Sequence, residues 1–101
     1  MPVEFSRSTT EEKATLAIAG SLDAITAPEI RVVVDELVNE KQKKIVVDLA
    51  GLDLIDSSGV AVLVALYKRI RALGGSVIVV GARDQPLAIF RLLRMDRVFS
   101  I

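Results

Sequence analysis

Two adjacent serines between an acid and a glycine are the residues of this chain best suited to chemistry. Asp56-Ser57-Ser58-Gly59 follows the apolar pair Leu54-Ile55 and precedes an apolar helical segment that starts near Val60. The first N–H groups of a helix have no partner within the helix and lie at the positive end of its dipole, so this site tolerates an added anion such as a phosphoryl group. A serine there can be a helix cap, a nucleophile or a phosphorylation site.

The sequence contains nothing that would activate either serine as a nucleophile. The chain has no histidine and no cysteine, which removes the usual general base near neutral pH and all thiolate chemistry. It also has no G-x-S-x-G elbow and no glycine-rich pattern for binding nucleotide phosphates. Asp23, Asp53 and Asp56 offer carboxylates for a Mg²⁺ site, but no specific pattern supports one. We therefore expect no enzymatic activity, no cofactor and no metal.

Capping accounts for only one of the two serines. Serine is among the preferred N-cap residues, and one helix start needs one cap. We assign the cap to Ser57, which leaves Ser58 as the accessible hydroxyl because Gly59 has no side chain to shield it. Asp56 and Asp23 can each be a turn residue that bonds the nearby backbone or an acid of a functional site.

The composition predicts one domain over residues 1–101. Apolar residues make up 51% of the chain and charged residues 26%, and 13 Lys and Arg balance 13 Asp and Glu. This balance is typical of a globular domain and gives no net field that would attract nucleic acid or an anionic membrane. The longest apolar run, Val60–Tyr67, is far shorter than the ~20 residues of a membrane span. We expect a cytoplasmic protein without a nucleic-acid partner and without direct membrane insertion.

Hydrophobic periodicity and turn signals predict the elements that position these residues. Two opening strands, near Val3–Phe5 and Leu16–Ile18, flank a polar loop. A helix with one apolar stripe should run from about Ala27 to Asn39, with Thr26 as its cap and Glu29 at the capping-box position. The other expected elements are the strands Ile45–Val47, Val77–Val80 and Val98–Ile101, a helix from the serine turn to Gly74, and a helix from Asp84 to about Arg94.

The resulting order, β-β-α-β-α-β-α-β, is typical of an α/β domain with a mostly parallel sheet and an antiparallel N-terminal strand. Functional loops of such sheets lie at the carboxyl ends of the strands. Two loops in that position carry polar residues, namely Gly20–Thr26 and Asp53–Gly59. If both rise from the same edge of the sheet, Asp23 would face the same partner surface as Ser57 and Ser58.

These two loops resemble those of the STAS domain, and within it the small stand-alone anti-sigma factor antagonists (anti-anti-sigma factors) of bacteria. Gly20-Ser21-Leu22-Asp23 with Thr26-Ala27 is similar to the family's G-x-[LI]-D-x-x-[TN]-[AS] loop. The stretch Asp53–Val60 contains its φ-D-S-[ST]-G-φ signature, and Leu73-Gly74-Gly75 before a strand also fits. The resemblance covers almost the whole chain and implies the STAS fold.

The resemblance also implies a phosphorylation switch. In that family a partner that is both anti-sigma factor and ATP-dependent serine kinase phosphorylates the second hydroxyl of the signature, which corresponds to Ser58. Asp23 corresponds to the acid beside it. The unphosphorylated protein binds the anti-sigma factor and frees the sigma factor, whereas the phosphorylated protein releases its partner until a protein phosphatase restores it.

The residues that would contact the partner are Ser21, Asp23, Thr26, Asp56, Ser57, Ser58 and Gly59. An alternative of another class is a constitutive STAS subunit of a larger assembly, such as a stress-signalling complex or a lipid-transport ATPase. In that case Ser58 would not be modified.

Overall fold

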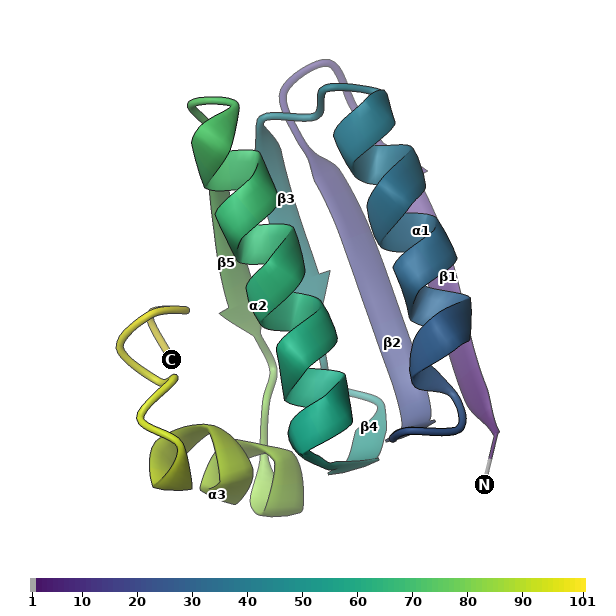
Figure 1. Cartoon of the computed structure of the whole chain (residues 1–101), viewed down its shortest axis with the longest axis vertical. Coiled ribbons are helices and arrows are strands. Elements are labelled where there is room, and N and C mark those ends of the chain that lie inside the picture. The colour runs from purple at the N-terminus through teal and green to yellow at the C-terminus, as the bar shows by residue number, and fades with distance from the viewer. Residues whose placement is uncertain (1) are drawn as a thin grey trace.

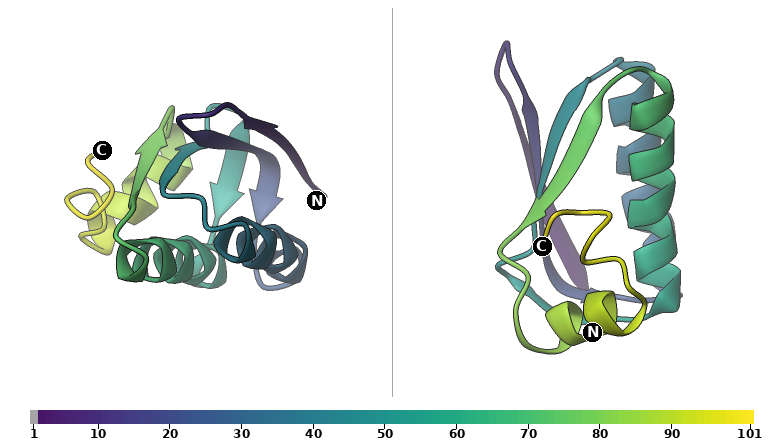
Figure 2. Two further views of the ribbon diagram at one scale, coloured as in Figure 1. Left: turned by 90° about the horizontal axis from the view of Figure 1, so that it is seen from above. Right: turned by 90° about the vertical axis from the view of Figure 1, so that its left-hand side faces the viewer.

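A five-stranded sheet carries two long helices on one face. The computed structural model describes residues 2–101 (Figure 1). Helices α1 (Ala27–Asn39) and α2 (Ser57–Ala72) lie side by side on the sheet, and α3 (Asp84–Leu92) lies at one end of it (Figures 1 and 2). The strands are β1 (Val3–Thr9), β2 (Ala14–Leu22), β3 (Lys44–Asp48), β4 (Leu52–Ile55) and β5 (Ser76–Val80).

The long strand β2 has a pairing partner on both sides. It runs antiparallel to β1, with Val3 opposite Gly20. On its other side it pairs in parallel with β3 along its first half and with β4 at its carboxyl end, where Leu22 lies opposite Ile55. Strand β5 extends the sheet in parallel beyond β3. The predicted mostly parallel sheet with an antiparallel N-terminal strand is confirmed.

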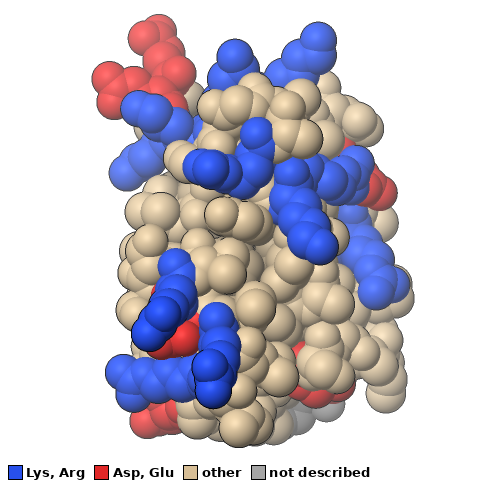
Figure 3. Space-filling view, turned by 60° about the vertical axis from the view of Figure 1, so that its left-hand side comes forward, with Lys and Arg blue, Asp and Glu red and all other residues tan. Residues whose placement is uncertain are grey.

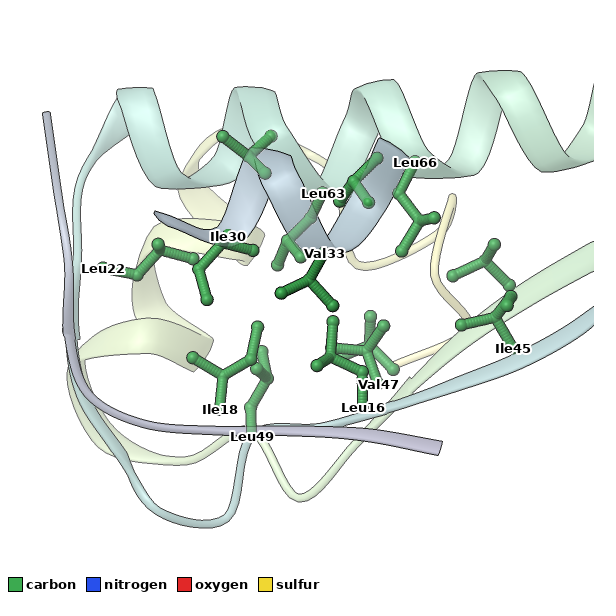
Figure 4. Packing of buried hydrophobic residues seen from close by; sticks show 14 of the residues in the cluster. Leu16, Ile18, Leu22, Ile30, Val33, Ile45, Val47, Leu49, Leu63 and Leu66 are labelled. Carbon is green, nitrogen blue, oxygen red and sulfur yellow. The ribbon is translucent and has the colours of Figure 1, made fainter. Parts of the chain in front are cut away.

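The core is largely aliphatic, and most of it lies between the sheet and the two long helices (Figure 4). Alternate residues of β2 and β3 point into it, because successive side chains of a strand face opposite sides of the sheet. Helix α1 has the predicted bounds and buries the predicted stripe. Core residues labelled in the close-up view include Leu16, Ile18, Ile45, Val47, Ile30, Val33, Leu63 and Leu66 (Figure 4).

The observed order, β-β-α-β-β-α-β-α, differs from the predicted one in two places: within residues 2–101 it has an additional strand, β4, before α2 and no strand after α3. This strand has only four residues, and Asp53 and Leu54 are both exposed between the buried Leu52 and Ile55. The apolar residues therefore lack the alternation by which a strand is detected. Strand β4 forms because the end of β2 offers it a parallel partner.

The predicted closing strand, Val98–Ile101, was wrong. The segment is a series of turns in which the N–H of Phe99 donates to the carbonyl of Met95 at 3.1 Å and that of Ile101 donates to Asp96 at 2.8 Å. The segment is apolar because one of its side chains packs into the core, and not because the segment forms a strand. Phe99 is fully buried, and its ring meets those of Tyr67 and Phe90 edge-on, with centroids 5.7 and 5.8 Å apart.

Replacing Phe99 should therefore destabilise the domain as a core truncation does. We expect Phe99→Ala to lower the free energy of unfolding by about 3–5 kcal/mol, measured by urea denaturation. Ile101→Ala serves as the control, because this residue belongs to the same segment but is 37% exposed, and its loss should cost less than about 1 kcal/mol. Equal, small losses in both variants would contradict the packing described here.

Candidate functional site

The two polar loops lie side by side at one edge of the sheet. Strands β2 and β4 are parallel neighbours that end together, so the loop after Leu22 and the helix start after Ile55 leave the sheet at adjacent positions. The N–H of Asp56 donates to the carbonyl of Leu22 at 3.2 Å and fastens one chain segment to the other. The expectation that both loops rise from the same edge is confirmed.

Asp56 is the N-cap of α2 and also the bridge between the loops. One carboxylate oxygen, Oδ1, accepts the N–H of Gly59 at 3.0 Å, and the other, Oδ2, accepts the N–H of Ala24 at 3.2 Å. Its negative charge also lies at the positive end of the helix dipole. The prediction that Ser57 caps this helix was wrong, because the extended backbone of Asp56 (φ −114°, ψ −174°) already places a carboxylate over the first turn.

Both serines are therefore free of any capping role. Ser57 is exposed and Ser58 is half-buried in the first turn of α2. Within residues 2–101 neither hydroxyl has a hydrogen-bond partner, and the backbone N–H of each serine also lacks an acceptor. The start of α2 thus presents two hydroxyls and two N–H donors.

Gly59 brings α2 close to the end of β2. The sequence predicts that this glycine leaves Ser58 unshielded and contacts a partner, but the structure shows that Gly59 is itself buried. A Cβ atom here would lie 2.6 Å from the carbonyl oxygen of Leu22 and 2.7 Å from Cγ1 of Ile55. Only a residue without a side chain allows this approach of helix to sheet.

Asp23 holds the neighbouring loop in a fixed turn. Its Oδ1 accepts the N–H of Ile25 at 2.9 Å and that of Thr26 at 3.0 Å. These hydrogen bonds stabilise the ionised carboxylate and hold the pKa of Asp23 below its ordinary value of 3.8. The bond from the Thr26 N–H contributes most. Asp23 is therefore a turn residue by geometry, and its half-exposed position leaves it open to a partner as well.

Thr26 supports the same turn from inside. Its hydroxyl donates to the carbonyl of Ser21 at 2.8 Å and accepts the N–H of Asp23 at 3.0 Å. The predicted capping box with Glu29 was wrong, because the Thr26 backbone is already helical (φ −92°, ψ −18°) and its side chain makes no cap hydrogen bond.

Besides Gly59, two further predicted contact residues do not reach the surface. Ser21 is 3% exposed and Thr26 is 5% exposed, so neither side chain can touch a partner directly. The loop residues that remain available are Asp23, Asp56, Ser57 and Ser58.

Gln85 of α3 holds the end of β4, a role that sequence reasoning missed. Its Oε1 accepts the N–H of Ile55 and its Nε2 donates to the carbonyl of the same residue, both at 2.9 Å. The amide thus makes the pair of bonds that a neighbouring strand would make. Nothing in the local sequence signals this contact, since it joins residues 30 positions apart.

The carboxylates of the site do not converge on a metal position. Among residues 2–101, no group of three or more Asp, Glu, His or Cys side chains could hold an ion. None of the helices described is long and apolar enough to cross a membrane.

The comparison with known families matches the chain to the STAS domain over residues 5–101. The chain belongs to the STAS domain family. This STAS domain is 35% identical over 85 residues to the anti-sigma F factor antagonist of Paenibacillus polymyxa, a match that covers 83% of this chain and 70% of that protein.

Solved structures of anti-sigma factor antagonists share the fold. The antagonist from Mycobacterium paratuberculosis superposes with a TM-score of 0.87 at 21% identity, covering 96% of this STAS domain and 82% of that chain. The antagonist SpoIIAA in its unphosphorylated form gives a TM-score of 0.73 at 21% identity, with 97% and 100% covered. Its phosphorylated form from Bacillus gives 0.73 at 20% identity, with 94% and 99% covered.

The double role of Asp56 predicts a stability loss when its carboxylate is removed. Asp56→Ala deletes the helix cap and the bond to Ala24, so we expect the free energy of unfolding to fall by about 2 kcal/mol, measured by urea denaturation. Asp53→Ala is the matched control, since Asp53 is an exposed acid on β4 that caps no helix. A loss in Asp56→Ala no larger than in this control would contradict the bridge.

The lowered pKa of Asp23 predicts a pH-dependent contribution to stability. The ionised carboxylate stabilises the folded STAS domain above the ordinary value of 3.8, and this contribution is lost as the pH falls below it through the lowered pKa. We expect Asp23→Asn to be less stable than wild type at neutral pH. The difference should shrink as urea unfolding is repeated down to about pH 2. A difference that does not change with pH would contradict the role of the ionised form.

Proposed function

We propose that this STAS domain is an anti-sigma factor antagonist controlled by phosphorylation, a binding module without catalytic activity. In its unphosphorylated form it binds an anti-sigma factor that is also a serine kinase, so that the sigma factor is freed. Phosphorylation of Ser58 ends this binding, and a protein phosphatase restores it. The interaction takes place in the cytoplasm.

The main support for the proposal is that Asp56, and not Ser58, caps the start of α2. Asp56 supplies the cap, so the hydroxyl of Ser58 is spare and can accept a phosphoryl group without loss of the helix start. The unpaired N–H groups and the helix dipole favour the added negative charge. The 35% identity to a named anti-sigma F factor antagonist supports the same conclusion.

Phosphorylation would end binding through bulk and charge at a contact surface. A phosphoryl group adds about −1.5 to −2 charges, and in a packed interface or beside an acid it disrupts by repulsion and desolvation. Ser58 lies two residues after Asp56, whose carboxylate joins the two loops. A partner packed closely against both loops would have to accommodate this group next to an existing negative charge.

Incubation with purified anti-sigma factors of the same genome and ATP, followed by phosphosite mapping by mass spectrometry, tests the proposal. We expect phosphate on Ser58 of wild type and of Ser57→Ala, and none on Ser58→Ala, which should still bind the anti-sigma factor. Ser57→Ala is the matched control because Ser57 is the more exposed of the two serines. Ser58→Asp should weaken binding at least about tenfold.

Phosphate on neither serine of the turn would overturn the proposed switch. Stable assembly with a membrane ATPase or a stress-signalling complex, without modification of Ser58, would instead favour a constitutive STAS subunit. The distinction between Ser57 and Ser58 requires fragment ions that separate adjacent residues, because both hydroxyls are free of internal partners in the part of the chain described.

A further inference from the structure

The side chain at the tip of the loop between β2 and α1 is apolar and almost fully exposed. Ile25 is 87% exposed, more than any other large apolar residue described, and it lies two residues from Asp23. Single exposed apolar side chains are common on protein surfaces, so exposure alone carries no conclusion. The backbone beneath Ile25 distinguishes it from the others.

That backbone is held on both sides of Ile25. The N–H of Ile25 itself and that of Thr26 donate to Asp23, and the N–H of Ala24 donates to Asp56. Three successive N–H groups are thus fixed by two carboxylates, one from each loop of the site. A side chain presented from a fixed backbone loses little freedom on binding, which favours affinity.

The charges around Ile25 indicate the chemistry of the surface that it would meet. Among residues 2–101, the nearby acids Asp23, Glu29 and Asp56 form no ion pair. The basic residues of α2, Lys68, Arg69 and Arg71, lie at its far end. Lys and Arg gather along the upper end of the space-filling view, with a smaller group near the lower end (Figure 3). The loop that carries Ile25, with the starts of α1 and α2 beside it, thus combines an apolar tip with three acids that form no ion pair among the residues described.

We propose that Ile25 is the apolar anchor of the partner-binding surface, and that it enters an apolar pocket of the anti-sigma factor rimmed by Lys or Arg side chains facing Asp23 and Glu29. This inference rests on the proposed function and names the residue that determines specificity at that site. Energetically dominant contacts are those that fill a pocket and exclude water, whereas charges at the rim set orientation and association rate.

The test compares three variants with wild type in calorimetric titrations against the anti-sigma factor that phosphorylates Ser58. Ile25→Ala should weaken binding at least about tenfold, and Ile25→Leu, which keeps an apolar side chain of similar size, less than about threefold. Leu92→Ala is the matched control. Leu92 is 75% exposed but lies on α3, which is on the opposite side of α2 from α1 (Figure 1). It should bind like wild type. The urea midpoint of all three should match wild type.

Added salt gives an independent readout of the basic rim. Raising the ionic strength should weaken wild type and Ile25→Ala by the same factor, because it screens the charges and not the apolar contact. If Ile25→Ala binds as tightly as wild type, or if binding does not respond to salt, this inference is overturned while the proposed function stands. If wild type binds no anti-sigma factor of its genome, the proposed function fails and this inference fails with it.

Discussion

One carboxylate, that of Asp56, joins the two parts of the candidate site. Its two oxygens bind backbone N–H groups of different segments, the first turn of α2 and the loop between β2 and α1. Neither segment is adjacent to the other in sequence, and no other side chain described bonds to both. The relative position of the two loops therefore depends on this one carboxylate, whose negative charge also suits the positive end of α2.

This arrangement is possible only because of the sheet topology. Strand β4 pairs with the last residues of β2 after β3 has ended, so two strands that precede functional loops finish next to each other. Gly59 then allows α2 to start against the carbonyl of Leu22, where any side chain would collide. The short strand, the acid and the glycine act together, which gives the D-S-S-G pattern a structural meaning besides its chemical one.

Much of the fold could be predicted because its signals are local and periodic. The stripe of α1 repeats every three or four residues, and the strands β3 and β5 are runs of β-branched residues in which every second residue is buried. The short strand β4 and the turn around Phe99 could not be predicted in this way, because each depends on partners distant in sequence. Phe99 has the composition of a strand residue but is held by the rings of Tyr67 and Phe90.

The site was predictable in its location but not in its internal roles. Motif and strand order placed Asp23 and the serines at one edge, which the structure confirms. Residue preference alone could not show whether Asp56, Ser57 or Ser58 caps α2, since Asp and Ser are equally preferred as N-cap residues. The extended backbone of Asp56 makes it the cap. The exposure of Ile25 and the burial of Ser21 follow from tertiary packing that no local pattern encodes.

The contact between Gln85 and Ile55 has a further consequence for solubility. An open strand edge offers unpaired N–H and C=O groups that can recruit a strand from another molecule. By occupying both backbone groups of Ile55, the amide closes the carboxyl end of the β4 edge to such recruitment, next to the two loops of the candidate site. The exposed loops of the candidate site thus adjoin a strand end whose backbone groups are already paired.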